Sequence, residues 1–274
     1  MKFEFVWDPD KLTYEDIPAW AHENIIFSSV GGKLCSAFMN TPEGLRKIPT
    51  GELVYVIGHE YGNALYAEEK KEQQISPQEQ KLIDLLTGFP PPHPDSLAYA
   101  AKIAPQGGLM FEFGVGEGTS INIIANAVPQ RKVFGFDCFT GLPEDWKAGN
   151  DKGKFAQDQL PVVPQNVELI VGLFEDTLDE FINKYSTYPV SFVHLDADLY
   201  SSTSFILNKF IERDLIHPGA IMVFDEIYDI HGGLSGENFR HEGKAFIEFL
   251  EKTGYSFEFV GRRNNESFAF RIIK

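Results

Sequence analysis

Three alternating glycines, Gly114, Gly116 and Gly118, lie between a short apolar segment and a helix-like run that starts at Thr119. Without a Cβ atom, glycine lets a backbone turn tightly and approach a ligand closely. The helix that follows would present free N–H groups and a partial positive charge to an anionic group. A dinucleotide site requires G-x-G-x-x-G. Here Thr119 leaves the pattern G-x-G-x-G, with the acid Glu112 two residues ahead, which is typical of a site for S-adenosylmethionine (SAM). The alternative is a strand–helix corner that binds no ligand.

Two further residues follow predicted strands, where ligands of an open α/β sheet bind. Asp137 lies about 20 residues beyond the glycine turn, the distance expected of a ribose-binding carboxylate. Its two oxygens could accept both ribose hydroxyls; the alternative is a helix-capping or solvated aspartate. Phe174 follows the next strand and could pack on an adenine face or fill a buried corner.

Four acids follow the last two predicted parallel strands: Asp196, Asp198, Asp225 and Glu226. Their mutual repulsion is costly unless a cation or a shared proton offsets it. The spacing of Asp196, Asp225 and Glu226 would let them converge on one hard cation, which would lower the pKa of a substrate hydroxyl. Asp198 would then take the proton. Alternatively, one or two of these acids cap the helix that begins near Thr203.

Alternating strand and helix patterns would position these residues. The predicted strands span 109–113, 132–137, 167–171, 190–196 and 220–225, and the predicted helices span 119–127, 176–185, 203–214 and 243–252. Near-continuous apolar strands are expected when helices cover both faces of a parallel sheet. Two later runs, 255–260 and 267–272, flank a turn signal and predict a terminal hairpin. The expected fold is a doubly wound, seven-stranded, mostly parallel Rossmann-like sheet with one antiparallel strand.

Residues 1–107 read as an irregular N-terminal extension ahead of a domain at 108–274. A strand is predicted at Leu53–Ile57. A helix starts at Pro77, where Ser76 and Glu79 form a capping box, and ends at Gly88. Another helix is predicted at 95–103.

The composition narrows the classes of partner. The chain has 274 residues, with 24 basic and 40 acidic side chains and a net charge of −16. This field repels polyphosphates, so a nucleic-acid substrate is not expected. Two cysteines with no paired spacing argue against a disulfide framework or a cysteine zinc site. No signal peptide is recognisable, and no apolar run approaches the ~20 residues that span a bilayer. We therefore expect a cytoplasmic protein without a membrane partner.

Two loops are candidates to cover the site. Trp146, in a long polar loop from Pro143 to Asn166, could cover a substrate or anchor that loop to the core. The glycine-rich stretch 232–236, near His231, His241 and Glu242, is typical of a mobile loop.

Several motifs, in this order, resemble the macrocin O-methyltransferase-like family of class I SAM-dependent methyltransferases. They are Glu112–Ser120, Phe134–Trp146, Gly172–Leu178, His194–Thr203 and Phe224–Glu226, and the resemblance covers roughly residues 108–274. It implies O-methylation of sugar hydroxyls, often on natural products, usually with Mg²⁺. It also implies that the N-terminal extension, residues 1–107, acts as a lid that binds the methyl acceptor. Carried over by motif, Asp196 is the first metal-binding aspartate and Asp198 the general base. Asp225 and Glu226 match an Asp-Asp pair that holds the ion, with Glu226 one methylene longer than the family's residue.

The residues predicted to bind the cofactor are Glu112, Gly114, Gly116, Gly118, Thr119, Ser120, Asp137, Phe139, Gly172, Phe174 and Asp196. The expected partner is a small-molecule hydroxyl acceptor. Relatives in this family are often dimeric or larger, so a homodimer is the expected assembly. An NAD-dependent oxidoreductase and a non-catalytic SAM-binding protein remain alternatives. Thr119, in place of the last required glycine, argues against the oxidoreductase.

Overall fold

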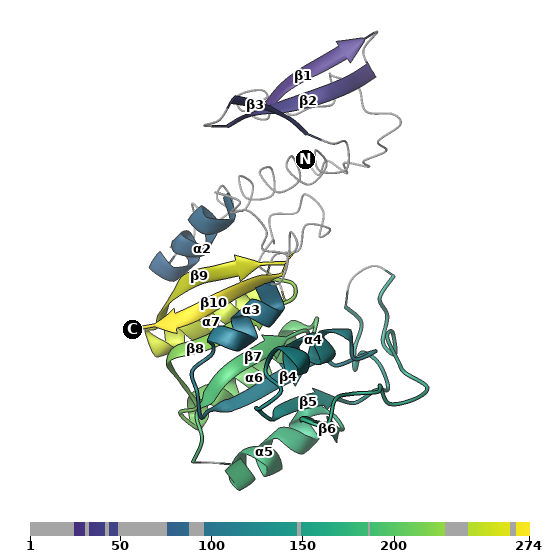
Figure 1. Cartoon of the computed structure of the whole chain (residues 1–274), viewed down its shortest axis with the longest axis vertical. Coiled ribbons are helices and arrows are strands. Elements are labelled where there is room, and N and C mark those ends of the chain that lie inside the picture. The colour runs from purple at the N-terminus through teal and green to yellow at the C-terminus, as the bar shows by residue number, and fades with distance from the viewer. Residues whose placement is uncertain are drawn as a thin grey trace. The chain divides into compact units, whose positions relative to one another are not determined.

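The chain forms two compact units in the computed structural model, which describes residues 25–30, 33–41, 44–48, 76–87, 96–146, 149–185, 187–227, 241–263 and 267–274. The larger unit contains residues 76–229 and 239–274 (Figure 1). The boundary expected at residue 107 falls inside this unit, because the helices α2 (Pro77–Thr87) and α3 (Ser96–Ile103) belong to it. Both helices lie where the sequence predicts them.

The smaller unit contains an antiparallel sheet of three strands, β1 (Ile25–Val30), β2 (Lys33–Thr41) and β3 (Gly44–Ile48). This sheet is not among the elements predicted from the sequence, which reads as irregular over this region. Val30 pairs with Lys33, so only Gly31 and Gly32 separate two strands in the sequence. A Gly-Gly pair between two apolar runs is a hairpin signal that would have found them. The strand predicted at Leu53–Ile57 lies outside the described residues.

The larger unit is built on a seven-stranded sheet with the order β6-β5-β4-β7-β8-β10-β9. Its strands are β4 (Leu109–Phe113), β5 (Val133–Asp137), β6 (Val167–Val171), β7 (Val190–Leu195), β8 (Ile216–Phe224), β9 (Ser256–Arg262) and β10 (Phe268–Ile273). Neighbours pair parallel, except that β10 runs antiparallel to β8 and β9. This confirms the predicted fold. The strand order reverses between β4 and β7, the switch point at which such sheets bind ligands.

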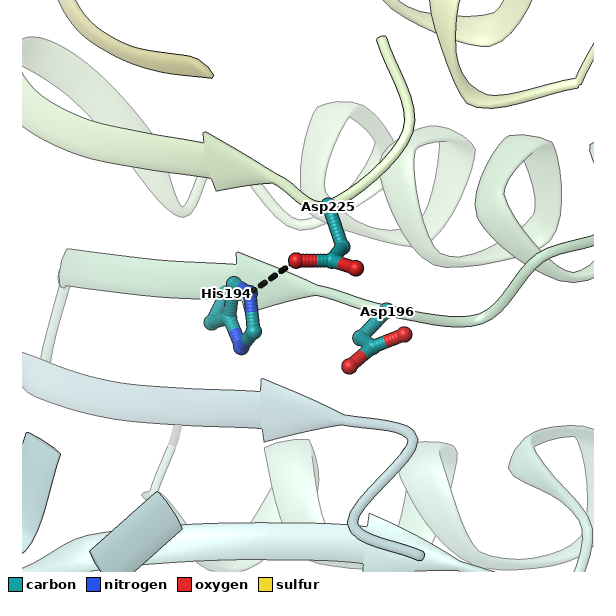
Figure 2. Close-up of side chains that lie close together, drawn as sticks. All are labelled: His194, Asp196 and Asp225. Carbon is teal, nitrogen blue, oxygen red and sulfur yellow. Dashed lines mark ion pairs between the residues drawn. The ribbon is translucent and has the colours of Figure 1, made fainter. Parts of the chain in front are cut away.

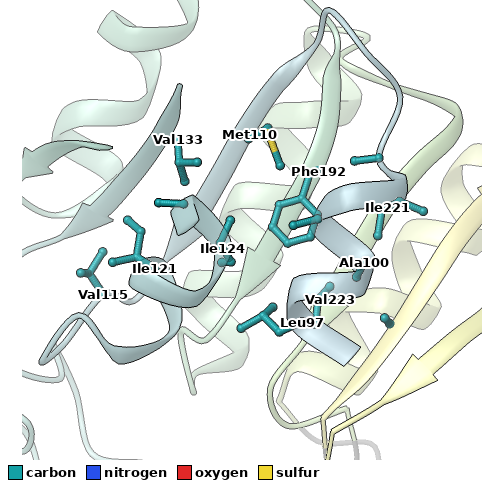
Figure 3. Packing of buried hydrophobic residues seen from close by; sticks show 14 of the residues in the cluster. Leu97, Ala100, Met110, Val115, Ile121, Ile124, Val133, Phe192, Ile221 and Val223 are labelled. Carbon is teal, nitrogen blue, oxygen red and sulfur yellow. The ribbon is translucent and has the colours of Figure 1, made fainter. Parts of the chain in front are cut away.

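Helices cover both faces of this sheet. In addition to α2 and α3, the helices are α4 (Thr119–Ala127), α5 (Phe174–Tyr185), α6 (Tyr200–Glu212) and α7 (Glu242–Thr253). On one face, α3 and α4 pack aliphatic side chains such as Leu97, Ile121 and Ile124 against the sheet (Figure 3). Met110 of β4 belongs to this layer, and the next residue, Phe111, points to the opposite face.

The opposite face of the sheet is aromatic. Phe111 packs against Phe181 of α5 at 5.6 Å and Phe210 of α6 at 5.9 Å between ring centroids. Further along the sheet, Phe246 of α7 lies 4.7 Å from Phe224 of β8 by the same measure. Offset and edge-on ring pairs add about 0.5–1.5 kcal/mol each beyond burial. Two different packing layers therefore fix the strands whose ends carry the acids.

Most differences between expectation and structure are at element ends. Strand β8 begins at Ile216 instead of Ala220, because Pro218 and Gly219 lie inside it and obscure its start in the sequence. Its pairing with β7 is irregular over the same stretch, which accommodates those two residues. Among the described residues, no helix combines the length and apolar character that crossing a membrane requires.

Candidate active site

A cavity of about 440 Å³ opens at the carboxyl ends of strands β4 to β8. The residues predicted from sequence that line it are Gly114, Gly116, Thr119, Ser120, Asp137, Gly172, Phe174, Asp196, Asp198, Asp225 and Glu226. The structure therefore brings together side chains that the sequence spreads over more than a hundred positions. Five strand ends meet at one edge of the sheet because the strands are parallel.

The glycine turn follows β4 and needs glycine for two different reasons. Gly114 has a φ of +87°, and a Cβ atom there would lie 1.8 Å from the carbonyl oxygen of Asp196. Gly116 has a φ of +51°, but a Cβ atom there would meet nothing within 4 Å. Gly114 therefore allows the turn to pack against the end of β7, whereas Gly116 leaves open space on the ligand side.

Asp137 braces the glycine turn from the end of β5. Its Oδ2 accepts hydrogen bonds from the backbone N–H groups of Val115 and Gly116, both at 2.8 Å. Its Oδ1 accepts the N–H of Phe139 at 2.7 Å. A carboxylate offers about four acceptor positions, so three are in use and one remains for a ligand. The carboxylate lines the cavity, but it is not free on both oxygens as the ribose hypothesis assumes.

Three residues predicted to touch a cofactor are not among those that line the cavity: Glu112, Gly118 and Phe139. Glu112 is fully buried inside β4. Gly118 precedes helix α4, and a Cβ atom there would lie 2.7 Å from the side chain of Pro161. Phe139 is 6% exposed and belongs to the hydrophobic core. These residues shape the walls from behind.

Phe174 fills a corner beside the core and also faces the cavity. It lines the cavity, and its ring also packs edge-on against Phe113, with 5.4 Å between centroids. One side of the ring is therefore available to a flat ligand, while the core holds the ring in place.

The carboxylates at the ends of β7 and β8 form a close group with His194, a residue that was not predicted to belong to the site. Ligand-type atoms of His194, Asp196 and Asp225 all lie within 4.8 Å of one another (Figure 2). His194 Nε2 lies 3.9 Å from Asp225 Oδ1. Glu226, predicted as a metal ligand with Asp196 and Asp225, lines the same cavity but is not part of this group.

Asp196 has the most crowded electrostatic environment of the three. Burial raises the pKa of its carboxyl well above the usual range, and the charges of Asp225, Glu242 and Asp198 raise it further. Burial and like charges both disfavour the ionised form. A shared proton or a bound cation would therefore stabilise this group.

Behind the group lies a buried pair, Glu112 and His194. Glu112 Oε1 lies 2.7 Å from His194 Nδ1, and both side chains are at most 1% exposed. Burial raises the pKa of the Glu112 carboxyl, and the contact with His194 partly opposes that shift. The two residues sit at paired positions on β4 and β7. Each is a polar residue one position before the end of a mostly apolar strand, a sequence signal that marks both residues as unusual but does not reveal that they pair.

A second buried acid, Glu242, ties the strand ends together from the first turn of α7. Its Oε1 accepts the N–H of Ala197, and its Oε2 accepts the N–H of Glu226, both at 3.0 Å. Its side chain is fully buried, which raises the pKa of its carboxyl well above the usual range. Asp198, the residue after Ala197, has a φ of +59°. This left-handed conformation costs energy and persists only where the surrounding structure restrains the backbone. Glu242 provides part of that restraint.

The loop after β5 closes one side of the cavity. Trp146 lines it and packs edge-on against His241, with 5.8 Å between ring centroids. Glu144 Oε1 accepts a 2.6 Å hydrogen bond from Ser201 Oγ at the start of α6. The prediction that Trp146 covers a substrate is compatible with this position. The stretch 232–236 and His231 lie outside the described residues.

Comparisons with known proteins agree with this geometry. Residues 111–227 match the model of a family described as a methyltransferase domain. The chain is similar to the solved structure of CalS11, a calicheamicin methyltransferase, with 21% identity over 77% of this chain and 91% of that one, and a TM-score of 0.50. A search of curated proteins found no match.

Two further solved structures align with similar coverage. The O-methyltransferase TomG from Streptomyces achromogenes, in complex with SAM, has 17% identity over 78% of this chain and 89% of that one, with a TM-score of 0.41. An O-methyltransferase from Bacillus cereus in complex with SAH has 15% identity over 79% and 90%, also with a TM-score of 0.41.

The family match and the fold agree on the kind of domain. Residues 111–227 match a methyltransferase domain, and the seven-stranded sheet of the larger unit has the Rossmann-like fold of such enzymes. The family match supports neither alternative, the NAD-dependent oxidoreductase or the non-catalytic SAM-binding protein. The match covers methyltransferase domains in general, so the resemblance to the macrocin O-methyltransferase-like family stays a prediction.

Proposed function

We propose that this protein transfers the methyl group of SAM to a hydroxyl group of a small molecule, namely a sugar or a glycosylated natural product. The observation that carries the proposal is a single cavity whose walls join the glycine turn to Asp196, Asp198 and Asp225. A cofactor bound along the turn would present its methyl group to these acids. The similarity to CalS11, a calicheamicin methyltransferase, agrees with a natural-product acceptor.

The cofactor half of the reaction rests on the glycine turn. Gly116 leaves space for a close ligand, Asp137 keeps one acceptor position for a ribose hydroxyl, and Phe174 offers a ring to the adenine. Glu112, Gly118 and Phe139 would act from behind by holding these walls.

In the transfer step, the acceptor oxygen attacks the methyl carbon in line with the departing thioether. The C–O bond forms as the C–S bond breaks, and SAH leaves as a neutral thioether. The proton of the acceptor hydroxyl passes to the carboxylate of Asp198, which lines the cavity at the start of the β7–α6 connection. Positioning supplies much of the rate in such a reaction, and the base contributes the rest.

A divalent cation, Mg²⁺ in the resemblance, fits the chemistry of the group at the strand ends. Asp196 and Asp225 offer carboxylate oxygens to one point, and their crowded negative charges favour a cation. When bound, such an ion would supply Lewis-acid stabilisation of the acceptor oxygen. We also propose that residues 1–107 help to bind the acceptor.

The first experiment is calorimetric titration of SAM and SAH into the purified protein. Binding with a Kd in the micromolar range is expected, and absence of binding to folded protein would contradict the proposal. Methyl transfer from labelled SAM is then measured on a panel of sugars, phenols and hydroxylated lipids. Transfer to sugars is expected; transfer to phenols alone would overturn the acceptor class.

A further inference from the structure

We infer that His194 is the third ligand of a divalent cation held with Asp196 and Asp225, and that this site prefers first-row transition metals to Mg²⁺. The inference rests on the proposed function, because it assigns the ligands and the ion of the same reaction centre. It replaces the ligand set Asp196–Asp225–Glu226 that the sequence predicts.

The first argument is the state of two buried atoms. His194 Nε2 and Asp225 Oδ1 are both inaccessible to solvent, and neither has a hydrogen-bond partner among the residues that the structure describes. Arg263 Nη1 lies 4.0 Å from Asp225 Oδ1, which is beyond hydrogen-bond distance. The two buried atoms face each other across 3.9 Å, with Asp196 beside them (Figure 2). Buried polar atoms are nearly always satisfied, so a pair of unsatisfied ones calls for a physical reason. A cation between them would satisfy both atoms at once.

The second argument is the orientation of the imidazole. Glu112 Oε1 lies 2.7 Å from Nδ1. An ionised carboxylate can only accept, and the tautomer that donates Nδ1–H to it has the lone pair of Nε2 facing Asp225. Metal-binding histidines usually have such a partner on the second nitrogen, which fixes the ring and increases the basicity of the ligand. The carboxylate behind the ring therefore prepares the nitrogen for a cation.

The third argument concerns the kind of ion. Mg²⁺ strongly prefers oxygen ligands and retains several waters. A site with one imidazole nitrogen and two carboxylates favours later first-row metals, whose affinities rise from Mn²⁺ towards Co²⁺ and Ni²⁺. Asp196 and Asp225 line the cavity, so the ion would have its open positions on the acceptor side.

The test uses Co²⁺ as the probe, the full-length chain without a histidine tag, and calorimetry supported by the visible spectrum of the bound ion. Co²⁺ is expected to bind one site at least tenfold more tightly than Mg²⁺. His194→Asn should weaken Co²⁺ binding at least tenfold, because the asparagine amide can still donate to Glu112 but cannot replace Nε2. Glu226→Gln is the matched control and should change Co²⁺ affinity by no more than about twofold.

Glu112→Gln provides a second variant in case His194→Asn does not fold. It should weaken Co²⁺ binding about 10–100-fold, the usual effect of removing the partner of a metal-bound histidine. SAM affinity is measured in His194→Asn and Glu226→Gln, which do not belong to the predicted cofactor site, and should stay within about threefold of the wild type.

Three results would overturn the inference: no Co²⁺ binding by protein that binds SAM, tighter binding of Mg²⁺ than of Co²⁺, or a loss of Co²⁺ binding in Glu226→Gln but not in the other two variants. Failure of the wild type to bind SAM would instead contradict the proposed function. The two failures are therefore distinguishable in one set of titrations.

Discussion

The cavity has two halves that are built in different ways. The glycine half consists of the turn at 114–120 and Asp137, and backbone hydrogen bonds hold it together. The carboxylate half consists of Asp196, Asp198 and Asp225, and buried ionisable side chains support it: Glu112, His194 and Glu242. The first half depends on conformations that only glycine adopts easily, and the second depends on charges kept away from water. Substitutions should therefore affect cofactor binding in one half and turnover in the other.

The largest effect is expected where the halves touch. Gly114→Ala would place a Cβ atom 1.8 Å from the carbonyl oxygen of Asp196 and would force a strained φ. We expect a loss of about 3–5 kcal/mol in the free energy of unfolding, measured by urea denaturation. Gly116→Ala is the control, because only the cost of its φ applies there. Equal destabilisation by the two variants would contradict the close contact.

Replacing the base should separate turnover from binding. Asp198→Asn is expected to slow methyl transfer about 10²–10⁴-fold, the usual contribution of a general base. Asparagine tolerates the left-handed backbone at this position, so the fold and the SAM affinity should be preserved. Single-turnover rates at saturating SAM provide the measurement. A rate within threefold of the wild type would assign the proton to another group.

Glu242 tests whether the carboxylate half needs its buried support. Glu242→Ala would leave the N–H groups of Ala197 and Glu226 without their acceptor. At about 1–3 kcal/mol per buried, unsatisfied group, we expect a clear fall in stability and a lower kcat. Glu242→Gln can accept only one of the two bonds and should be intermediate. If Glu242→Ala kept a normal kcat but bound SAM more weakly, Glu242 would support the glycine half and not the carboxylate half.

Asp137 tests the glycine half. The backbone N–H groups of Val115 and Gly116 both donate to the Asp137 carboxylate. In Asp137→Asn they would face either the amide NH₂, which cannot accept, or the amide oxygen, which is a weaker acceptor than a carboxylate. Bonds to charged groups contribute about 1.5–3 kcal/mol, so SAM affinity should fall about 10–100-fold while single-turnover rates at saturating SAM stay nearly constant. Glu117→Gln removes a charge from the same wall and should leave the affinity within about threefold.

The smallest effect is expected at the loop that covers the cavity. Ser201→Ala removes an exposed hydrogen bond to Glu144, which is typically worth about 0.5–1.5 kcal/mol. We expect the KM for the acceptor to rise about 2–5-fold, with SAM affinity unchanged. Ser204→Ala, on the same helix, is the control in initial-rate measurements. An equal effect of both substitutions would show that the loop contact does not contribute.

The two halves also differ in how much of each could be predicted from the sequence. The turn at 114–118, helix α4 and the strands from β4 onward could be identified from the sequence, because glycine spacing and apolar periodicity are local. The acids after β7 and β8 could be identified from the rule that ligands bind at strand ends. The roles of Glu112, His194 and Glu242 could not, because a buried carboxylate looks like any other acid until its partners are known.

The sequence by itself determined the order of strands and helices in the larger unit, the glycine turn and the class of cofactor, since each depends on residues close together along the chain. Only the tertiary structure decided that Asp137 braces the turn, that His194 and not Glu226 joins Asp196 and Asp225, and that Glu242 links two strand ends. The physical reason is that burial and long-range pairing change what an ionisable side chain does. Both depend on which strands lie next to each other, not on the spacing of residues in the sequence.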